Sequence, residues 1–550
     1  MSANIHFIGV PQQHAELPGA DAIGFKAWNL ARMAAIGLRV PPAFVLGTRH
    51  CAEAARLASG AAVGSASAGS TAHLPAGAHQ LPEAVRGAWP GAMRALEQAT
   101  GRRFGDSVRP LLVSVRSGAP VSMPGMMDTL LDIGLAETTL PGLLRLTGNP
   151  RLVWDAWRRL IASYGEVVMG LDAAVFEREL LGLAADGDDR ALDWDGLRQL
   201  ASRSLAAYRS AAREPFPQDV NEQLERAIAA VYASWNSPRA IEYRRGHGIA
   251  DAIGTAVTVQ AMVFGNAGGA SGAGVGFTRD PTTGAPGLWV DFLFNAQGED
   301  VVSGRRSAHG HAALAQALPA VWAELEDGAD QLEHALGDMQ DIEFTVQEGK
   351  LWWLQTRNGK RTPLAAARIA LDLCDAGVID RAEALKRCEG FDESRLSIER
   401  VIGADGAALA PIAQAATASS GVAIGEIALD AEAARKRVAA GARVVLLRRD
   451  AETSDLVALE LADGLLTARG ARTAHAAVVA RQLGKVCLVG CDTLVIDEQR
   501  RVITLGAREF AEGEVLTLDG NAGAIYAGAA RTVRELDQPL WARLTALRRG

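Results

Sequence analysis

Residues 466–485 read LTARGARTAHAAVVARQLGK, and this stretch decides how the C-terminal part of the chain is interpreted. A strand-like run, GLLTAR, leads into a turn at Gly470, and a helix-like run then stops at Gly484. Thr473 stands where it could cap that helix, which places His475 in the first helical turn. Free backbone N–H groups and the positive end of the helix dipole favour an anion at such a position.

A neutral imidazole at this position is a candidate nucleophile that would carry a phosphoryl group. The alternative is a buried structural histidine, which is the more frequent role of an isolated histidine. Cys487 and Cys491 follow on a strand, and we interpret them as core thiols.

The bulk composition limits the class of protein. A chain of 550 residues exceeds one hydrophobic core, so two to four domains are expected. The balance of 56 basic and 64 acidic residues, 56 − 64 = −8, argues against a nucleic-acid or anionic-membrane surface. Five scattered cysteines suggest neither a disulfide framework nor a zinc site. With no targeting signal or apolar span of about 18 residues, we expect a cytoplasmic protein.

Hydrophobic periodicity divides the chain into regions of mixed α/β character. The chain is expected to open with a loop, a helix and a strand at 18–45, followed by helices over 150–245, strands and glycine loops over 255–305, and a hairpin that turns at Glu348-Gly349. Helices are then expected over 363–400 and an Ala-rich linker or hinge over 404–421. The last part is expected to be a compact α/β domain that ends near Gly528, before a short basic tail.

A second group of residues suits phosphate binding. The glycines of NAGGASGAGVGFTRD (266–280), among them Gly272 and Gly274, offer N–H groups to a polyphosphate, and Arg279 and Arg116 offer forked donors. The pattern is neither G-x-G-x-x-G nor a Walker A loop, and such glycines also serve as plain turns.

Acidic and polar residues alternate on two later strands. Asp341 and Glu343 in QDIEFT point the same way and could hold Mg²⁺, although a solvated strand face is the plainer alternative. Gln355 and Arg357 alternate likewise on LQTRN and could reach the same cleft.

These segments together resemble the pyruvate phosphate dikinase family, and more loosely its relative phosphoenolpyruvate synthase. The similar segments follow the family's order across nearly the whole chain: SVRSGAPVSMPGMMDT (114–129), SGAGVGFTRDPTTG (271–284), FNAQGEDVVSG (294–304), QDIEFTVQEGKLWWLQTRNGKRT (340–362) and LTARGARTAHAAVVARQLGK (466–485).

The resemblance implies a multidomain α/β protein with an ATP-grasp nucleotide-binding region and a swivelling phosphohistidine domain. The boundaries that it implies are 1–362 for the nucleotide-binding domain, with a helical subdomain at about 140–250, then 363–415 for a helical connector and linker, 416–530 for the phosphohistidine domain and 531–550 for a C-terminal tail.

The resemblance also implies a reaction in which ATP gives its β-phosphoryl group to the histidine through a pyrophosphoryl intermediate, leaving AMP. By motif, His475 would be the carrier and Thr473 either a regulatory phosphorylation site or only the helix cap. Lys26 and Arg116 would bind the phosphates, and Asp341 and Glu343 would bind Mg²⁺. Gln355 and Arg357 would complete the nucleotide site. The phosphate-binding pattern described above adds Gly272, Gly274 and Arg279 to that site.

The chain departs from the family pattern at several positions. Phe25 and Ala27 replace expected glycines, Ala273 removes a hydroxyl, and Ala471-Arg472 and Ala474 replace the Gly-Gly or Gly-Met and the Ser or Cys that typically precede the histidine.

We expect the family's pyruvate-binding barrel to be absent from this sequence. We expect the acceptor on a separately encoded barrel chain that binds phosphoenolpyruvate or pyruvate, or else on another small-molecule acceptor domain. A non-catalytic nucleotide sensor, and a chain that is a portion of a longer protein, remain alternatives. Inorganic phosphate as a co-substrate and a homodimer are also left open.

Overall fold

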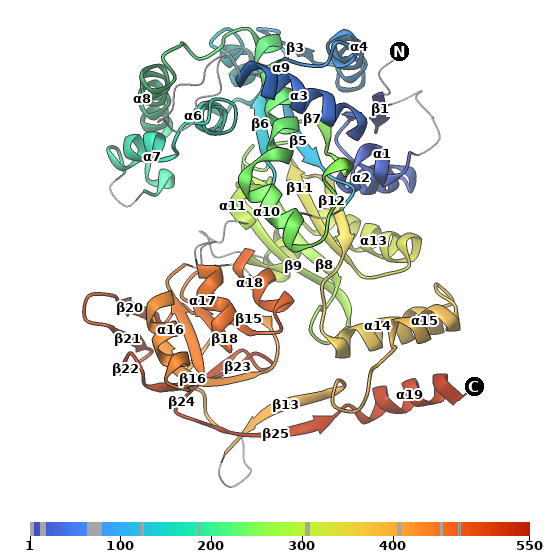
Figure 1. Cartoon of the computed structure of the whole chain (residues 1–550), viewed down its shortest axis with the longest axis vertical. Helices are drawn as coiled ribbons and strands as arrows, with labels where there is room; N and C mark the ends of the chain where they lie inside the picture. The colour runs from blue at the N-terminus through green and yellow to red at the C-terminus, as the bar shows by residue number, and fades with distance from the viewer. Residues whose placement is uncertain are drawn as a thin grey trace. The chain divides into compact units, whose positions relative to one another are not determined.

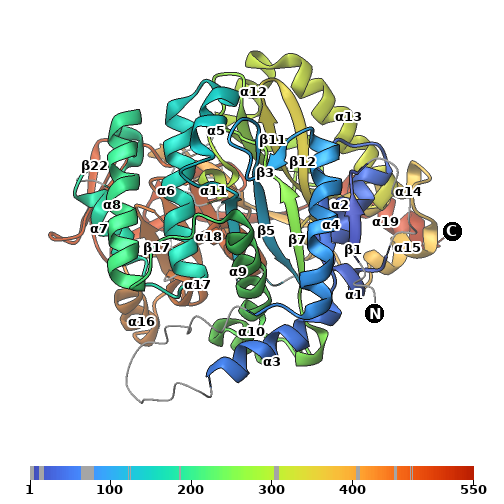
Figure 2. The same cartoon turned by 90° about the horizontal axis from the view of Figure 1, so that it is seen from above.

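The chain forms two compact units in the computed structural model (Figures 1 and 2). The first consists of Met1–Gly268 with Trp352–Gln355, and the second of Gly269–Leu351 with Thr356–Gly550. None of the helices among the described residues is long and apolar enough to cross a membrane. The structure describes residues 5–10, 18–62, 80–121, 123, 126–184, 187–302, 309–403, 409–450, 455–470, 472 and 475–549.

A five-stranded antiparallel sheet, in the order β1-β2-β7-β5-β6, forms the centre of the first unit. Every residue of β7 is buried, including the polar Thr258 and Gln260, and the Gln260 amide donates to the Pro41 carbonyl at 3.2 Å. Both faces of the sheet centre are therefore covered. The strands are β1 (Ile5–Ile8), β2 (Ala43–Leu46), β5 (Val113–Gly118), β6 (Thr129–Ile133) and β7 (Ala256–Ala261), beside the short pair β3 (Arg103–Phe104) and β4 (Pro110–Leu111).

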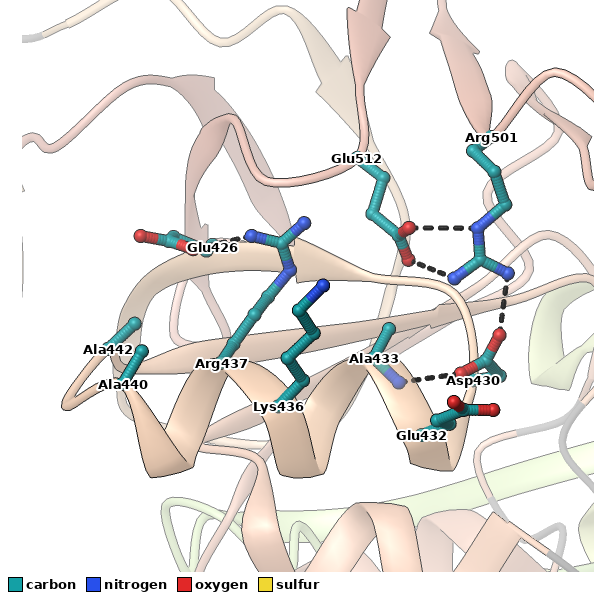
Figure 3. Close-up of a pocket in the computed structure, with 10 residues that line it drawn as sticks. All are labelled: Glu426, Asp430, Glu432, Ala433, Lys436, Arg437, Ala440, Ala442, Arg501 and Glu512. Atoms are coloured by element: carbon teal, nitrogen blue, oxygen red, sulfur yellow. Dashed lines mark hydrogen bonds and ion pairs between the residues drawn. The ribbon is translucent and has the colours of Figure 1, made fainter.

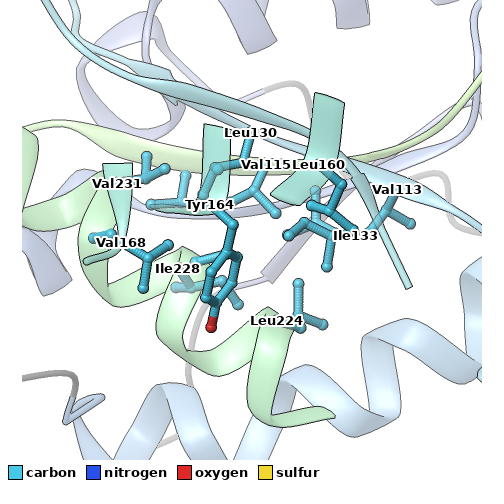
Figure 4. Packing of buried hydrophobic residues seen from close by; sticks show 14 of the residues in the cluster. Val113, Val115, Leu130, Ile133, Leu160, Tyr164, Val168, Leu224, Ile228 and Val231 are labelled. Atoms are coloured by element: carbon cyan, nitrogen blue, oxygen red, sulfur yellow. The ribbon is translucent and has the colours of Figure 1, made fainter. Parts of the chain in front are cut away.

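Helices pack on this sheet through a continuous apolar core. Figure 4 shows Tyr164 and Leu160 of one helix and Leu224 of another facing the buried valines and leucine of the sheet. The helical pattern predicted over 150–245 is confirmed, with Asn149 capping the helix that starts at Pro150. The helices are α1 (Ala20–Ile23), α2 (Phe25–Ala35), α3 (Cys51–Ala62), α4 (Glu83–Thr100), α5 (Leu140–Thr147), α6 (Pro150–Val167), α7 (Ala174–Leu181), α8 (Trp194–Ala212), α9 (Val220–Ala233) and α10 (Pro238–Gly246).

The second unit begins with another five-stranded sheet, in the order β10-β9-β8-β11-β12. The predicted hairpin is confirmed: Glu348 and Gly349 turn the chain with φ values of 51° and 75°, as a tight two-residue hairpin turn requires. The elements are β8 (Gly272–Arg279), β9 (Pro286–Phe294), α11 (Gly298–Val302), β10 (His309–Gly310), α12 (His311–Ala317), α13 (Pro319–Leu336), β11 (Gln340–Gln347) and β12 (Lys350–Asn358).

The prediction of a glycine loop over residues 266–280 is only partly correct. Residues 266–271 lie outside helices and strands, but Gly272–Arg279 form β8, which pairs with β9 on one side and β11 on the other. The glycines are needed there because aromatic rings cover them: a Cβ on Gly272 would collide with Phe292, and one on Gly274 with Phe344. Close packing of aromatic rings therefore explains why glycine occurs at these positions of β8, although the sequence pattern is typical of a loop.

The C-terminal half of the second unit is an eight-stranded mixed sheet with helices, as predicted for a compact α/β domain. Strands β16 to β19 run parallel, and apolar clusters lie on both faces. The sheet order is β14-β24-β23-β16-β17-β18-β19-β15, with β14 (Ala413–Gln414), β15 (Ala416–Ser419), β16 (Val422–Ala428), β17 (Val444–Arg448), β18 (Gly464–Thr467), β19 (Val486–Val489), β23 (Val515–Asp519) and β24 (Ala524–Ala527), helices α16 (Ala431–Ala439), α17 (Leu456–Leu461) and α18 (His475–Gln482), and a side sheet of β20 (Leu494–Asp497), β21 (Val502–Leu505) and β22 (Arg508–Ala511).

Two predictions about connecting segments are wrong. The linker expected over 404–421 contains β14 and β15, which join the edges of the large sheet, where the small buried side chains of Ala413 and Ala418 fit. The helices expected over 363–400 end earlier, as α14 (Pro363–Asp375) and α15 (Arg381–Arg387), and are followed by strand β13 (Ser397–Ile402).

The segment expected as a basic tail is folded. β25 (Arg531–Leu536) pairs antiparallel with β13 over six residues, and α19 (Gln538–Arg549) packs against α14 and α15, as Figure 1 shows. Leu540 and Leu544 are buried in this cluster, and Arg543 pairs with Asp372 at 2.8 Å. The chain that leaves the large sheet therefore returns to the helices that precede it.

The packing of α19 predicts a stability effect. Leu544→Ala removes a fully buried side chain and should lower the free energy of unfolding by about 3 kcal/mol. The same substitution at the exposed Leu144 of α5 is the matched control and should change it by less than about 0.5 kcal/mol. Differential scanning calorimetry of both variants measures the difference, and an unchanged melting profile for Leu544→Ala would contradict the packing.

Candidate active site

The elements that carry Lys26 and Arg116 meet in the first unit. Lys26 lies in the first turn of α2 and Arg116 on β5, whose last residue is Gly118. The turn before α2 approaches that strand end closely: the Phe25 N–H donates to Ala119 O at 2.8 Å, and Gly24 has φ 78°. A side chain on Gly24 would collide with the Gly118 backbone. The glycines expected at positions 25 and 27 are absent, so Gly24 alone supplies the glycine of this turn, and Ala27 is buried in the first turn of α2.

Asp341 and Glu343 lie on one face of the sheet in the second unit. Residues directly opposite each other on paired strands share a face, and the register gives two rows: Asp341, Phe277 and Trp289 in one, and Glu343, Val275 and Asp291 in the next. Gly272 and Gly274 have the opposite parity on β8, where Phe292 and Phe344 cover them. The two carboxylates and the two glycines therefore belong to opposite faces.

The Asp341 carboxylate is paired within this face. Arg357 donates from Nε to Asp341 Oδ2 at 2.7 Å. Burial raises the pKa of Asp341, an effect that Arg357 opposes and the nearby Glu343 reinforces. The pKa of Arg357 is raised as well, because Asp341 and Glu343 outweigh the lowering effect of its own burial. Arg481 opposes the rise in the pKa of Asp341 as well, so the charge of the two carboxylates is partly offset before any metal binds.

The donor set fits Mg²⁺. This ion prefers oxygen ligands and is commonly held by one or two carboxylates together with substrate phosphates and water. Asp341 and Glu343 supply two carboxylates, and no cluster of three or more His, Cys, Asp or Glu side chains suited to a metal occurs in the part of the chain that the structure describes. Phosphate and water oxygens would have to complete the coordination.

Arg279 is engaged by carboxylates that sequence reasoning missed. It lies at the end of β8 and donates to Glu333 of α13 and Asp372 of α14, both at 2.8 Å. These partners raise its pKa against the lowering effect of burial. Because 54 and 93 residues separate them from Arg279, no local sequence signal could have identified the group. Its contacts are those of a structural ion pair, so its role with ATP remains a prediction.

Gln355 lies on β12, in the short segment whose contacts group it with the first unit. Its predicted contact with nucleotide, like those of Gly272 and Gly274, is not tested by the structure. β8 is paired on both sides, so most of its N–H groups serve the sheet rather than a ligand.

His475 is the first residue of α18, as predicted. The helix ends at Gln482, and its C-terminus has the paired hydrogen bonds of a Schellman motif, from Gly484 N to Arg481 O at 3.2 Å and from Lys485 N to Ala480 O at 2.8 Å. Gly484 has the expected positive φ, 66°. Thr473 lies outside the described residues. Cys487 and Cys491 are buried, and burial raises the pKa of the Cys487 thiol to about 12, in agreement with core thiols.

A charged pocket of about 530 Å³ beside α16 contains none of the predicted site residues (Figure 3). Arg501 pairs there with Glu512 at 2.6 Å and with Asp430 at 2.5 Å, and Arg437 pairs with Glu426 at 2.7 Å. Asp430 also accepts from Ala433 N at 2.7 Å and caps α16. These pairings hold α16 to the sheet and involve five of the seven charged residues that line the pocket.

Two regions of the chain match models of known protein families. Residues 20–319 and 317–375 match the family model described as pyruvate phosphate dikinase, AMP/ATP-binding domain, and residues 441–523 match the PEP-utilising enzyme, mobile domain. Similar proteins are the pyruvate, phosphate dikinases of Clostridium symbiosum, 41% identical over 93% of this chain and 57% of the relative, and of Rhizobium meliloti, 39% identical over 96% and 58%.

A chloroplastic pyruvate, phosphate dikinase of Oryza sativa subsp. japonica is 42% identical over 92% of this chain and 52% of its own length. The chain thus spans a little over half the length of the curated relatives it matches. The AMP/ATP-binding model covers more than half of the chain, and the match to the mobile-domain model contains His475. The chain belongs to the pyruvate phosphate dikinase family.

Proposed function

We propose that this chain catalyses the ATP-dependent phosphorylation of His475, the ATP-consuming half of a dikinase reaction. The observation that carries the proposal is that His475 begins α18, where a helix presents its unpaired N–H groups, within the region that matches a mobile domain. The nucleotide would be bound by the region that matches the AMP/ATP-binding model.

The proposed division of labour follows the predicted domains. Residues 1–362 would bind nucleotide, 363–415 would connect, 416–530 would carry the histidine, and 531–550 would return to the connector helices. Lys26 and Arg116 would contact the ATP phosphates, Gln355 and Arg357 would complete the nucleotide site, and Asp341 and Glu343 would bind Mg²⁺. Bound Mg²⁺ would supply positive charge that offsets the phosphate charge during transfer.

The proposed transfer joins an imidazole nitrogen of His475 to the β-phosphorus of ATP. The bond between the β-phosphorus and the oxygen it shares with the α-phosphorus breaks, and AMP leaves with the electron pair. The terminal phosphoryl group of the resulting pyrophosphoryl-histidine then passes to inorganic phosphate or water. Arg116 and Lys26 would stabilise the charge that develops on the phosphoryl oxygens.

The phosphoryl acceptor would be bound by a further domain. The relatives are named for pyruvate and phosphate, and we propose a barrel that binds pyruvate or phosphoenolpyruvate, on a partner chain or in a longer form of this one. A homodimer is a further arrangement that the proposal accommodates.

The first prediction of this proposal concerns the carrier. Incubation with Mg²⁺ and ATP labelled at the β-phosphate should give acid-labile label on the protein together with AMP, because phosphohistidine is the proposed intermediate. His475→Ala should abolish the label and leave ATP binding intact. His334→Ala, which removes an exposed histidine of α13, is the matched control and should label normally.

Two outcomes of this experiment would reject the proposal. Full labelling of His475→Ala would show that another residue is the carrier. A folded wild-type protein that binds ATP, but gives neither label nor AMP with or without inorganic phosphate, would instead support a nucleotide-sensing role.

A second prediction concerns Arg116. Arg116→Ala should slow labelling about a hundredfold, because it removes a donor to the phosphoryl oxygens in the transition state. Arg145→Ala removes an exposed arginine of the same unit and should leave the rate unchanged. Single-turnover labelling at saturating ATP measures both rates, and equal rates in the two variants would remove Arg116 from the site.

A third prediction concerns pH. The raised pKa of Asp341 means that its proton competes with Mg²⁺ at a higher pH than the proton of an ordinary aspartate would. The apparent Mg²⁺ affinity should therefore fall as the pH decreases toward that pKa, and Asp341→Asn should weaken Mg²⁺ binding and flatten the pH dependence. Mg²⁺ titrations of nucleotide binding between pH 5 and 8 measure this. An unchanged slope in Asp341→Asn would exclude Asp341 as a ligand.

A further inference from the structure

Arg472 belongs to the segment just before His475, the carrier segment. It connects this segment to the sheet on which Asp341 and Glu343 lie. It lies three residues before His475, where the family motif typically has glycine or methionine. Its Nε and one terminal nitrogen donate to Asp291 Oδ1 of β9 at 3.1 and 3.0 Å, and the same terminal nitrogen donates to Val290 O at 3.2 Å. The contact lies within the second unit.

The same guanidinium is stacked on an aromatic ring of β9. The central carbon of the Arg472 guanidinium is 3.9 Å from the centre of the Trp289 ring, within the range of a cation–π contact. Arg472 therefore contacts three successive residues of one strand. An arginine is suited to this combination because its planar head can pair with a carboxylate and stack at the same time.

The contact falls on the face of the proposed metal site. Asp291, Val275 and Glu343 form one row across β9, β8 and β11, and Trp289, Phe277 and Asp341 form the next. With strands about 4.8 Å apart, the backbones of Asp291 and Glu343 are separated by about 10 Å. An attachment at Asp291 thus holds the carrier segment on the face where Asp341 and Glu343 lie.

Arg481 links this attachment to the helix itself. It lies in the last turn of α18, donates to Arg472 O at 3.3 Å and to Ala418 O at 2.9 Å, and its guanidinium is 5.2 Å from the Phe277 ring centre. The backbone of Arg472 is therefore fixed to the helix that begins at His475. Movement of α18 away from the sheet would have to separate Arg472 from Asp291.

The pair is suited to a reversible contact. In the contact, 5% of the Asp291 side chain and 17% of the Arg472 side chain are exposed. Burying a charge pair removes both groups from water, so separating them restores hydration and offsets much of the lost attraction. Removing one partner alone is more harmful, because the other charge stays buried without it.

We propose that Arg472 is a positioning residue which, through Asp291 and Trp289, holds the carrier segment against the β9-β8-β11 face for phosphorylation. The proposal rests on the proposed function, because it assigns the contact to the step in which His475 receives its phosphoryl group. Release of Arg472 from Asp291 then accompanies departure of the carrier. The Arg472–Asp291 pair determines the fraction of molecules in which His475 is positioned for phosphorylation, and it does not contribute to ATP affinity.

A double-mutant cycle tests the assignment. Arg472→Met and Asp291→Asn should each slow labelling of His475 about tenfold at saturating ATP, with the dissociation constant of ATP unchanged. The double variant should be no slower than the slower single variant, because both changes break one contact. Arg443→Met, which breaks the exposed Arg443–Asp463 pair of the same region, is the matched control and should label at the wild-type rate.

A spectroscopic measurement separates this idea from the proposed function. In protein labelled with 5-fluorotryptophan, the Trp289 resonance, assigned with Trp289→Phe, should shift in Arg472→Met and stay in place in Arg443→Met. If the wild type gives no label, the proposed function fails, while the fluorine shift still tests the contact. An unmoved Trp289 resonance in Arg472→Met, or labelling defects that multiply in the double variant, would overturn the positioning role.

Discussion

The two-sided pairing of β8 is the constraint on which the candidate site depends. Because β8 is paired with both β9 and β11, side-chain alternation is coordinated across three strands. One face then carries Asp341, Glu343 and Asp291, and the other carries the packed rings of Phe292 and Phe344. A shift of one residue in either pairing would put carboxylates into the aromatic core, so the packing of the rings fixes the position of the charges.

The sequence predicted the elements best where a local rule was sufficient. The place of His475 in the first turn of α18 and the end of that helix before Gly484 agree with the prediction from turn residues, and the hairpin at Glu348-Gly349 agrees with the prediction from the alternating apolar residues on either side of it. The alternation of Asp341 and Glu343 follows from strand geometry alone. These features require no knowledge of distant parts of the chain.

Features that depend on distant partners were missed. The glycines of β8 were interpreted as a loop because nothing near them in sequence announces Phe292 and Phe344. The Ala-rich segment that contains β14 and β15 has few of the branched residues typical of strands, and pairing with β24 and β19 determines its structure instead. Arg279 was assigned to phosphate by its chemistry, but that chemistry suits the carboxylates of Glu333 and Asp372 equally well.

The antiparallel pairing of β13 with β25 has a topological consequence. The chain runs out along one strand of this ribbon, forms the whole eight-stranded sheet, and runs back along the other. The carrier region is therefore joined covalently to the rest of the second unit through two adjacent strands, in addition to side-chain contacts such as Arg472–Asp291. A rotation of the region would be absorbed as twist in these two hydrogen-bonded strands. Such a joint would keep its length during a rotation, and the histidine would then move on an arc about the ribbon. Lengthening both strands by equal numbers of residues would change the radius of that arc without altering either fold.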